Sequence, residues 1–264
     1  MLTIEHPGGS YRMEPGVYRY DPRHEVVVGR HQPPSSTAVL RFMEYFSDHF
    51  RLEKIGRSQR IIAIAVAHHR FNYIHPFPDG NGRVSRLLSH AMALVTGIGA
   101  HGLWSISRGL ARGLEDRGEY LIMMNNTDAE RRGDTDGRGN LSLQALVEFI
   151  EWFCKVCLDQ LQFMATLFDF ERLRDRLSRY AIDELGLHPG SEVLLETILR
   201  SGELARSDAA RVIGTGERNA RNVLSALTSA GLLASATPKG PVALRFDSTS
   251  AESLFPRLFP ARAD

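Results

Sequence analysis

The sequence predicts a mainly α-helical protein, with a helical bundle that carries a small β-hairpin and a second, smaller domain after it. Two observations support this fold class. Apolar residues recur with helical spacing over most of residues 36–185, while strand-like runs are short and occur only near the two ends of the chain. A segment with glycine and proline at residues 186–190 then interrupts the helical pattern, so we predict domains at residues 1–186 and 187–264.

Length and composition are those of a globular protein. The 264 residues suit two domains better than one, 43% of them are apolar, and the net charge is +1 at pH 7. A net charge this close to zero gives no overall field that would attract nucleic acid or a membrane. No apolar run reaches about 18 residues, and the N-terminus lacks the basic and apolar regions of a signal peptide. We therefore expect a cytoplasmic protein without a membrane partner.

The first predicted elements are two short strands, at residues 17–20 and 25–28, joined by the turn sequence Asp-Pro-Arg-His. We expect them to form a hairpin over about residues 16–30. Such a hairpin either covers the core or presents an exposed edge to a partner chain. The local sequence leaves both interpretations open.

The bundle is predicted from the helical patterns that follow. A helix that ends near residue 50 has one apolar face, and the next helix, which runs to about residue 74, is apolar on nearly every side. A helix of that second kind belongs in the centre of a bundle. Further helices are expected at residues 104–114 and 118–126, and Ser142 is a candidate N-cap for a long helical stretch that reaches towards residue 185.

The two cysteines, Cys154 and Cys157, lie within that long helical stretch. No second pair exists that would complete a four-ligand zinc site. We therefore expect both to be small packing residues rather than redox or metal-binding groups.

The residues after the central helix combine several features of a phosphate-handling site. His75 ends the apolar run, and the ordinary histidine pKa of about 6.5 suits a general base near neutral pH. Asp79 supplies a carboxylate of the kind that holds Mg²⁺ beside substrate phosphates. Gly80 and Gly82 permit a positive φ and let backbone N–H groups approach an anion closely.

Helical spacing resumes after Gly82, so this loop would bring an anion to a helix N-terminus. Arg83 and Arg86 lie three residues apart on the first turn, where their guanidinium groups can bind further phosphate oxygens. Together these residues predict a site that binds a magnesium nucleotide and deprotonates a hydroxyl. That is the chemistry of phosphoryl or nucleotidyl transfer.

Residues 75–86, His-Pro-Phe-Pro-Asp-Gly-Asn-Gly-Arg-Val-Ser-Arg, resemble the signature of the Fic (filamentation induced by cAMP) family at every fixed position, His-x-Phe-x-[Asp/Glu]-Gly-Asn-Gly-Arg-x-x-Arg. The resemblance implies a Fic-type helical bundle with a hairpin flap. It also implies a protein adenylyltransferase, which moves AMP from ATP to a Ser, Thr or Tyr hydroxyl of a target protein and releases pyrophosphate. The related Doc branch phosphorylates instead, but it departs from the Gly-Asn-Gly-Arg stretch that is intact here.

The resemblance further implies a role for each residue of the signature. His75 would be the catalytic base, Asp79 would hold Mg²⁺, and Phe77 would anchor the loop on the core. The nucleotide and its phosphates would be bound by Gly80, Asn81, Gly82, Arg83, Arg86 and, near the adenine, Tyr120. The hairpin at residues 16–30 would be the flap, which docks the hydroxyl-bearing segment of the target by strand addition.

Many Fic proteins inhibit themselves through a [Ser/Thr]-x-x-x-Glu-[Gly/Asn] motif, and no Glu of this sequence is followed by Gly or Asn. Ser10 and Glu14 have the right spacing, but Pro15 follows them. Two interpretations remain. Either the site is restrained by an inhibitory partner, by self-association or by a segment outside this chain, or it is not restrained in this way.

The second predicted domain resembles a winged helix-turn-helix. Its pattern indicates helices at residues 191–200, 207–213 and 217–230, followed by strands at residues 232–236 and 242–246. This order of helices and hairpin is the basis of the resemblance.

Side chains that can reach phosphates or base edges of DNA occur early in the last of those helices and in the hairpin: Arg218, Asn219, Arg221, Asn222 and Lys239. Residues 200–247 contain seven Arg or Lys and four Asp or Glu, a small excess for a DNA-binding domain. DNA binding and docking of a protein partner therefore both remain open for this domain.

Three functions are consistent with these observations. The leading one is a protein adenylyltransferase that uses ATP and Mg²⁺. The second uses the same site for UMP, GMP or phosphoryl transfer, or for removal of AMP from a modified protein. The third is a DNA-binding regulator whose Fic unit senses nucleotide, although a pure sensor would not need the base and the carboxylate of His75 and Asp79.

Overall fold

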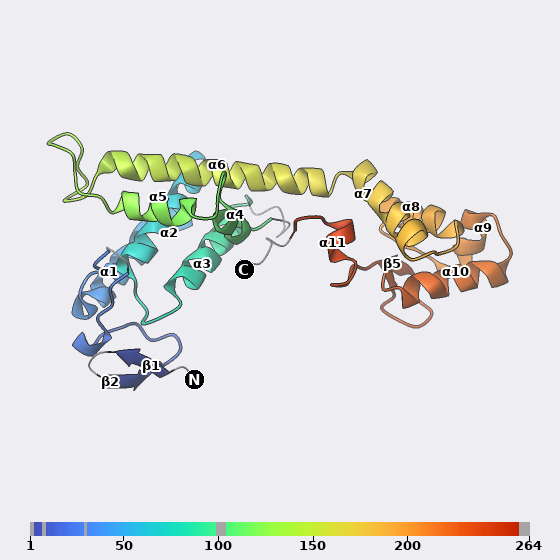
Figure 1. Cartoon of the computed structure of the whole chain (residues 1–264), viewed down its shortest axis with the longest axis horizontal. Helices are drawn as coiled ribbons and strands as arrows, with labels where there is room; N and C mark the ends of the chain where they lie inside the picture. Colours follow the sequence, from blue (N-terminus) through green and yellow to red (C-terminus); the bar gives the residue numbers. More distant parts are fainter. Residues whose placement is uncertain (1–2, 7–8, 29–30, 99–103, 259–264) are drawn as a thin grey trace. The chain divides into compact units, whose positions relative to one another are not determined.

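The computed structural model describes residues 3–6, 9–28, 31–98 and 104–258, and it divides into two compact units, Met1–Gln162 and Phe163–Asp264 (Figure 1). Helices make up most of both units, as the sequence predicts. None of the helices in the described part of the chain combines the length and apolarity that crossing a membrane requires.

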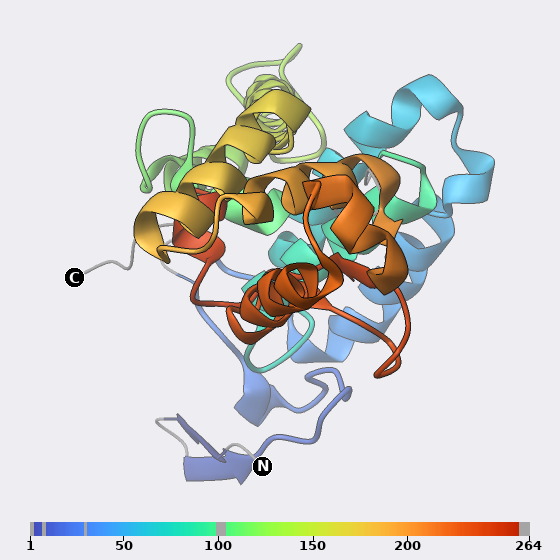
Figure 2. The same ribbon diagram turned by 90° about the vertical axis from the view of Figure 1, so that its right-hand side faces the viewer.

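The first unit begins with two paired strands, β1 (Thr3–His6) and β2 (Gly9–Arg12), which are antiparallel with Thr3 opposite Arg12 (Figure 2). The hairpin predicted over residues 16–30 is wrong. Its turn sequence is a short 3₁₀ helix, Pro22–His24, which Asp21 caps by accepting the backbone N–H of Arg23. The backbone N–H of Arg19 donates to the carbonyl of Pro76 at 2.8 Å. The backbone of Arg19 therefore bonds to the signature loop, and residues 17–20 form no strand pair with residues 25–28.

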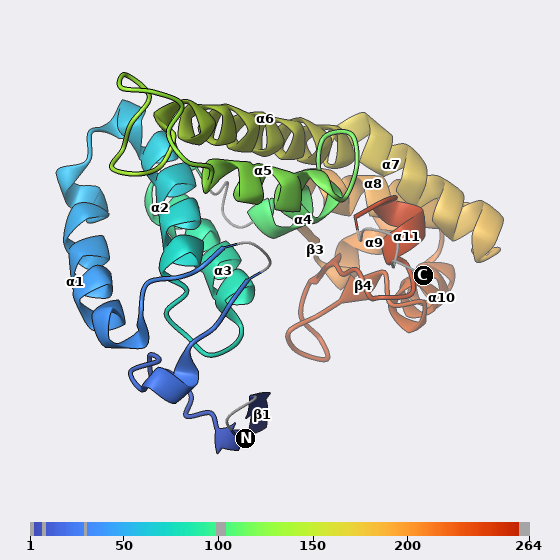
Figure 3. The same ribbon diagram turned by 60° about the vertical axis from the view of Figure 1, so that its left-hand side comes forward.

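The centre of the first unit is α2 (Arg60–Ile74), which packs between α1 (Val39–His49) and α3 (Asn81–Val95) (Figure 3). Both of its faces bury side chains, which confirms the prediction of a central helix. The buried residues are Ala63, Ile64, Ala65, Ala67, His68, His69, Phe71 and Ile74.

Three more helices follow at positions that agree with the sequence prediction: α4 (Ile106–Arg112), α5 (Glu119–Thr127) and α6 (Leu143–Leu167), of which α6 ends five residues beyond the first unit. Ser142 caps α6 by accepting the backbone N–H of Ala145 at 3.0 Å. Cys157 is buried on α6, where burial raises the pKa of its thiol to about 12, so it packs as a small apolar group. Short 3₁₀ helices link the larger elements: Ser36–Ala38, Leu52–Lys54 and Arg57–Gln59.

The long helical stretch predicted to reach residue 185 is interrupted. The helix α6 ends at Leu167, and a new helix, α7 (Phe170–Arg179), begins after Asp169. The side chain of Asp169 accepts the backbone N–H of Arg172 and so caps α7. A single turn of π-helix, Tyr180–Glu184, follows. A capping aspartate inside a continuous apolar pattern therefore marks the end of one helix and the start of the next.

The second unit contains α8 (Gly190–Ser201), α9 (Ala209–Ile213), α10 (Glu217–Ser229) and the short α11 (Ala251–Leu254). Its antiparallel sheet has the order β3-β5-β4, made by Glu203–Leu204, Val242–Leu244 and Leu233–Ala234. Another 3₁₀ helix, Arg206–Asp208, precedes α9. The sequence did not predict β3, because two residues carry no visible alternation and their partner lies about forty residues away.

The core of the second unit also includes residues that precede the predicted domain boundary. Leu173 and Leu177 of α7 pack in the same cluster as Leu194 and Ile198 of α8. The predicted boundary at residues 186/187 thus lies inside the second compact unit. A break in helical pattern is visible in a sequence, whereas the packing of a helix on later residues is not.

Candidate active site

His75 lies directly after α2, with an unusual backbone conformation. Its φ of 50° and ψ of 59° are left-handed, and among the described non-glycine residues only His75 and Arg257 have a positive φ. Such a conformation costs on the order of 1–3 kcal/mol and persists where surrounding contacts impose it. It turns the chain sharply out of α2 and into the signature loop.

The imidazole of His75 is in the form that a general base needs. Its Nδ1 lies 3.3 Å from the carbonyl oxygen of Asn72, and because a carbonyl can only accept, Nδ1 carries the proton and Nε2 keeps its lone pair. Burial lowers the pKa of His75 to about 4, and the positive charge of Arg19 acts in the same direction. The ring is therefore neutral at pH 7.

Two residues of the signature hold the loop in place. The side chain of Asn81 is 1% exposed, accepts the backbone N–H of Phe77 at 2.9 Å and donates to the carbonyl of Phe77 at 2.7 Å. The ring of Phe77 packs against Tyr18 and Phe71, with centroid distances of 5.3 and 6.3 Å. Phe77 is thus the anchor that the sequence predicts. Only the backbone of Asn81 remains available to an anion.

The loop ends in a nest of backbone groups at the N-terminus of α3. Gly80 caps the helix with a φ of 84°, a left-handed conformation that favours glycine. The backbone N–H groups of Asn81 and Gly82 have no hydrogen-bond partner within the described residues. Since the first N–H groups of a helix lack internal acceptors, this end of α3 can bind an anion.

Both arginines of the signature converge on this nest. A Cβ atom at Gly80 would lie 3.4 Å from Nη2 of Arg83, and a Cβ atom at Gly82 would lie 3.4 Å from Nη1 of Arg86. The two guanidinium groups therefore lie beside Gly80 and Gly82, next to the free N–H groups of Asn81 and Gly82. Arrangements of this kind match the several oxygens of a polyphosphate.

Asp79 is accessible to a metal ion. Its side chain is 48% exposed, and Oδ2 lies 3.2 Å from Nη2 of Arg83, an exposed ion pair that contributes little stability. No group of three His, Cys, Asp or Glu side chains within the described residues forms a protein-only metal site. The single carboxylate fits Mg²⁺, which usually takes one or two protein carboxylates and completes its shell with water and phosphate oxygens.

An open cavity of about 420 Å³ lies beside the nest. Asp79, Gly80 and Arg83 form one side of its lining, and residues 13–17 form the other. A smaller cavity of about 170 Å³ shares Met13, Glu14 and Val17 with the first and is also lined by Tyr20 and Pro78. The segment that the sequence assigned to the flap therefore borders the site, although it is not a hairpin.

Tyr120 belongs to a buried polar network behind the nest. Its hydroxyl lies 2.9 Å from Nε2 of His68, and Nδ1 of His68 lies 2.9 Å from Oγ of Ser89. Burial raises the pKa of Tyr120 to about 12, and the nearby guanidinium of Arg86 acts in the opposite direction. The hydroxyl of Tyr120 thus points into the protein near Arg86, and contact of its ring with adenine stays a prediction.

Sequence reasoning missed Arg19, whose side chain is fully buried and bonds to the main chain at the end of α2. One signal was available: a lone arginine between Tyr18 and Tyr20, in a run that was expected to be a strand. Its partners lie more than fifty residues away, so the sequence could not supply them.

The residues predicted to contact DNA lie on α10 and the β4–β5 hairpin. Arg218, Asn222 and Lys239 are exposed. Arg221 is exposed too and forms an ion pair with Glu217 at 2.7 Å, while Asn219 donates to the hydroxyl of Thr215 at 3.0 Å.

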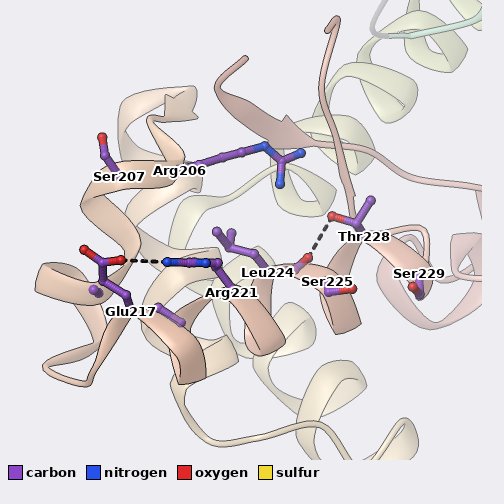
Figure 4. Close-up of a pocket in the computed structure, with 10 residues that line it drawn as sticks. Arg206, Ser207, Glu217, Arg221, Leu224, Ser225, Thr228 and Ser229 are labelled. Carbon is purple, nitrogen blue, oxygen red and sulfur yellow. Dashed lines mark hydrogen bonds and ion pairs between the residues drawn. The ribbon is translucent and has the colours of Figure 1, made fainter. Parts of the chain in front are cut away.

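A cavity of about 610 Å³ lies beside α10, and of the residues predicted to contact DNA its lining includes Arg221 alone (Figure 4). Arg206 and Arg221 lie on its lining together with Ser225 of α10, and Nε of Arg206 donates to the carbonyl of Gly240 at 3.1 Å. The lining therefore mixes charged and hydroxyl side chains with the apolar Ala210, Ala220 and Leu224.

Comparison with known proteins finds a family match for the N-terminal part of the chain. Residues 3–93, which include the whole signature, match the Fic/DOC family. The matched residues are about a third of the chain. The chain is also 36% identical over 85 residues to proteins named protein adenylyltransferase Fic from Drosophila willistoni and Drosophila erecta. Each match covers 32% of this chain but only 16% and 17%, respectively, of the relative's length.

Two solved structures are also similar to this chain. A Fic-domain-containing signaling protein from Bacteroides thetaiotaomicron is 22% identical with a TM-score of 0.42, covering 58% of this chain and 55% of its own. A Fic family protein from Desulfovibrio desulfuricans is 16% identical with the same TM-score of 0.42, covering 84% and 61%, respectively.

Proposed function

We propose that this protein is a protein adenylyltransferase, which transfers AMP from ATP to a Ser, Thr or Tyr hydroxyl of a target protein and releases pyrophosphate. The observation that carries the proposal is the neutral His75, whose unprotonated Nε2 belongs to the same loop as the N–H nest and the two arginines. The names of the Drosophila relatives, protein adenylyltransferase, agree with this reaction.

In this mechanism Nε2 of His75 accepts the proton of the target hydroxyl as its oxygen attacks the α-phosphorus of ATP. The bond from the α-phosphorus to the bridging oxygen breaks, and pyrophosphate leaves with the bonding electrons. Arg83, Arg86 and the backbone N–H groups of the nest bind the phosphate oxygens on which negative charge builds up. Mg²⁺ held by Asp79 would supply further positive charge at the phosphates.

The target would dock along residues 13–20, which contribute to the lining of both cavities beside the signature loop. The exposed side chain of Tyr20 and the half-buried Tyr18 would contact it there. Since residues 17–20 form no ladder with another strand in the described chain, a target segment can pair with the flap region, residues 16–30, by strand addition.

The reaction is tested by incubating the purified chain and a cell lysate with ATP that carries the label at either the α- or the γ-phosphate. We expect label in protein from the α-position alone, and mass spectrometry should find AMP on a hydroxyl side chain. His75→Ala should nearly abolish transfer, since general-base catalysis contributes on the order of 10²–10⁴-fold. His49→Ala, a change at an exposed histidine of α1, is the matched control.

Other outcomes of the same experiment would replace the proposal. Label from the γ-position alone would indicate phosphorylation. Transfer from labelled UTP or GTP in preference to ATP would change the nucleotide, and release of AMP from a modified target would indicate the reverse hydrolytic use of the site.

For the second unit we propose a winged helix-turn-helix that binds DNA. The order α8, β3, α9, α10, β4, β5 and the exposed Arg218, Asn222 and Lys239 support it. A gel shift on random duplex at low salt should detect binding, and Arg218→Ala should weaken it more than Arg200→Ala on α8. If wild-type chain shifts no DNA even at low salt, docking of an inhibitory partner or self-association becomes the better proposal for this unit.

A further inference from the structure

Arg19 is a buried arginine that contacts the main chain around the candidate base, His75. Its side chain is 0% exposed, and a guanidinium in that position is tolerated only where acceptors surround it. Nε donates to the carbonyl of His75 at 2.7 Å, and Nη2 donates to the carbonyl of Ile74 at 3.1 Å. The backbone N–H of the same residue donates to the carbonyl of Pro76 at 2.8 Å. One residue thus binds three consecutive carbonyls.

Those carbonyls lie where α2 ends and the signature loop begins. The last carbonyls of a helix receive no hydrogen bond from an N–H group of the same helix. The negative end of the helix dipole also favours a cation there. Arg19 meets both requirements at the end of the fifteen-residue α2. It therefore binds the main chain on both sides of His75 and at His75 itself.

The other half of the guanidinium is held from a different direction. Nη1 donates to Oε2 of Glu25 at 3.2 Å, and Nη2 also donates to the carbonyl of Pro34. Oε1 of Glu25 in turn accepts the backbone N–H of Ser36 at 2.8 Å. Arg19 is consequently fixed between the main chain at Ile74–Pro76 and the segment that leads into α1.

We propose that Arg19 is a positioning residue for the transfer reaction: its guanidinium imposes the left-handed turn at His75 that directs the imidazole towards the glycine loop. The expected loss of AMP transfer rests on the proposed function. The expected change in the backbone conformation of His75 does not. Without this side chain the carbonyls of Ile74 and His75 lose their partner. His75 can then relax to the ordinary helical conformation, which carries its Cβ atom and ring away from the nest.

A purely structural role for Arg19 would have different consequences. Loss of a tether between segments should lower stability and impair every activity of the first unit together, including nucleotide binding. A positioning role separates these effects. The hydrogen bonds of the Arg19 guanidinium do not involve Gly80, Gly82 or Arg86. Binding of MgATP should therefore survive while transfer fails.

The test compares Arg19→Met, Arg19→Lys and the control Arg41→Met, an exposed arginine of α1, in the full chain. For each variant we would measure the thermal midpoint, the dissociation constant of MgATP by calorimetry, and kcat for AMP transfer. We expect Arg19→Met to lower kcat by about 100-fold, because misplacing a catalytic group by ~1 Å costs on that order. The dissociation constant of MgATP should change by no more than about twofold. Arg41→Met should match the wild type.

Arg19→Lys should recover only part of kcat, since an ammonium group is a point donor and cannot reproduce the planar fork that serves Ile74 and His75 together. Crystal structures of both variants should show φ of His75 moved out of the left-handed region. Should Arg19→Met not fold, Arg19→Lys decides the question by the same measurements.

Two results would overturn the proposal. One is a folded Arg19 variant with wild-type kcat, and the other is a variant whose φ at His75 stays positive while kcat and MgATP affinity fall in parallel. Failure of the transfer reaction itself gives a different pattern. In that case wild-type chain transfers no AMP, yet φ of His75 still changes in the variants.

Discussion

The side chain of Asn81 bonds to both backbone groups of Phe77, accepting the N–H at 2.9 Å and donating to the carbonyl at 2.7 Å. This closed pair fixes the four residues between the base and the nest. It also explains why an asparagine stands between two glycines that otherwise expose their backbone. The side chain supports the loop from inside while the backbone remains available to phosphate.

Asn81→Asp should therefore destabilise the loop. The change removes the N–H donor to the Phe77 carbonyl and places two acceptor oxygens together, which costs on the order of 1–3 kcal/mol in a buried position. We expect a lower midpoint in urea and weaker MgATP binding. Asn126→Asp, at an exposed position of α5, is the control. Equal stability of the two variants would contradict the role assigned to the Asn81 amide.

The pH dependence of transfer should reflect the lowered pKa of His75. Because burial places that pKa at about 4, the neutral form that can accept a proton is present throughout the range above pH 5. We expect kcat at saturating MgATP to change little between pH 7.5 and 5.5. A base with an ordinary histidine pKa near 6.5 would instead lose about tenfold over that interval. A tenfold loss of kcat between pH 7.5 and 5.5 would contradict the burial of His75.

Arg86 should matter more than Arg83 for nucleotide binding. Arg83 has a side chain that is 75% exposed and already pairs with Asp79, whereas Arg86 is half-buried beside Gly82. Charge-assisted hydrogen bonds contribute about 1.5–3 kcal/mol, so Arg86→Ala should weaken MgATP binding by roughly 10- to 100-fold. Arg83→Ala should have a smaller effect, and the exposed Arg51→Ala none. The opposite order of the two signature arginines would show that the polyphosphate lies elsewhere.

Asp79→Asn should raise the concentration of Mg²⁺ needed for half-maximal transfer without loss of stability. An exposed ion pair contributes at most about 1 kcal/mol, so the thermal midpoint should stay within a few degrees of wild type. Titration of Mg²⁺ at fixed ATP provides the measurement. An unchanged magnesium requirement would remove Asp79 from the metal site.

His68 should make the first unit less stable in acid. Burial lowers its pKa to about 3, while the unfolded chain retains the ordinary value near 6.5, so only the unfolded state binds a proton between those limits. Stability is therefore complete above pH 6.5 and falls as the pH decreases, by about 2 kcal/mol at pH 5 from this residue alone. Urea unfolding can be followed by tryptophan fluorescence, because Trp104 and Trp152 both lie in the first unit. His68→Gln should show a smaller difference between pH 7.5 and 5.

The sequence predicted those parts of the site that lie close together along the chain. The signature places base, carboxylate, glycines and arginines within one short loop and the first turn of α3, so spacing alone relates them. The buried character of α2 was equally visible, since its apolar residues leave no polar face. The cap of α6 by Ser142 followed from a local rule.

Contacts between distant residues were not accessible to the same reasoning. Residues 17–20 have a strand-like pattern, but their actual partner is the carbonyl of Pro76. The run from α6 to residue 185 keeps its apolar period across Asp169, where the side chain caps a new helix. In the first case the predicted strand is absent, because its backbone bonds to a distant loop, and in the second a local cap divides one predicted helix into two.

The ion pair between Asp79 and Arg83 links the metal ligand to a phosphate ligand. Nη2 of Arg83 lies 3.2 Å from Oδ2 of Asp79, and both side chains are exposed, so burial does not hold the pair together. A divalent cation that binds the carboxylate of Asp79 frees the guanidinium of Arg83 to bind a phosphate. Conversely, a phosphate that binds the guanidinium frees the carboxylate for the cation. Metal and nucleotide should accordingly bind with positive cooperativity, each improving the other's affinity by the same factor.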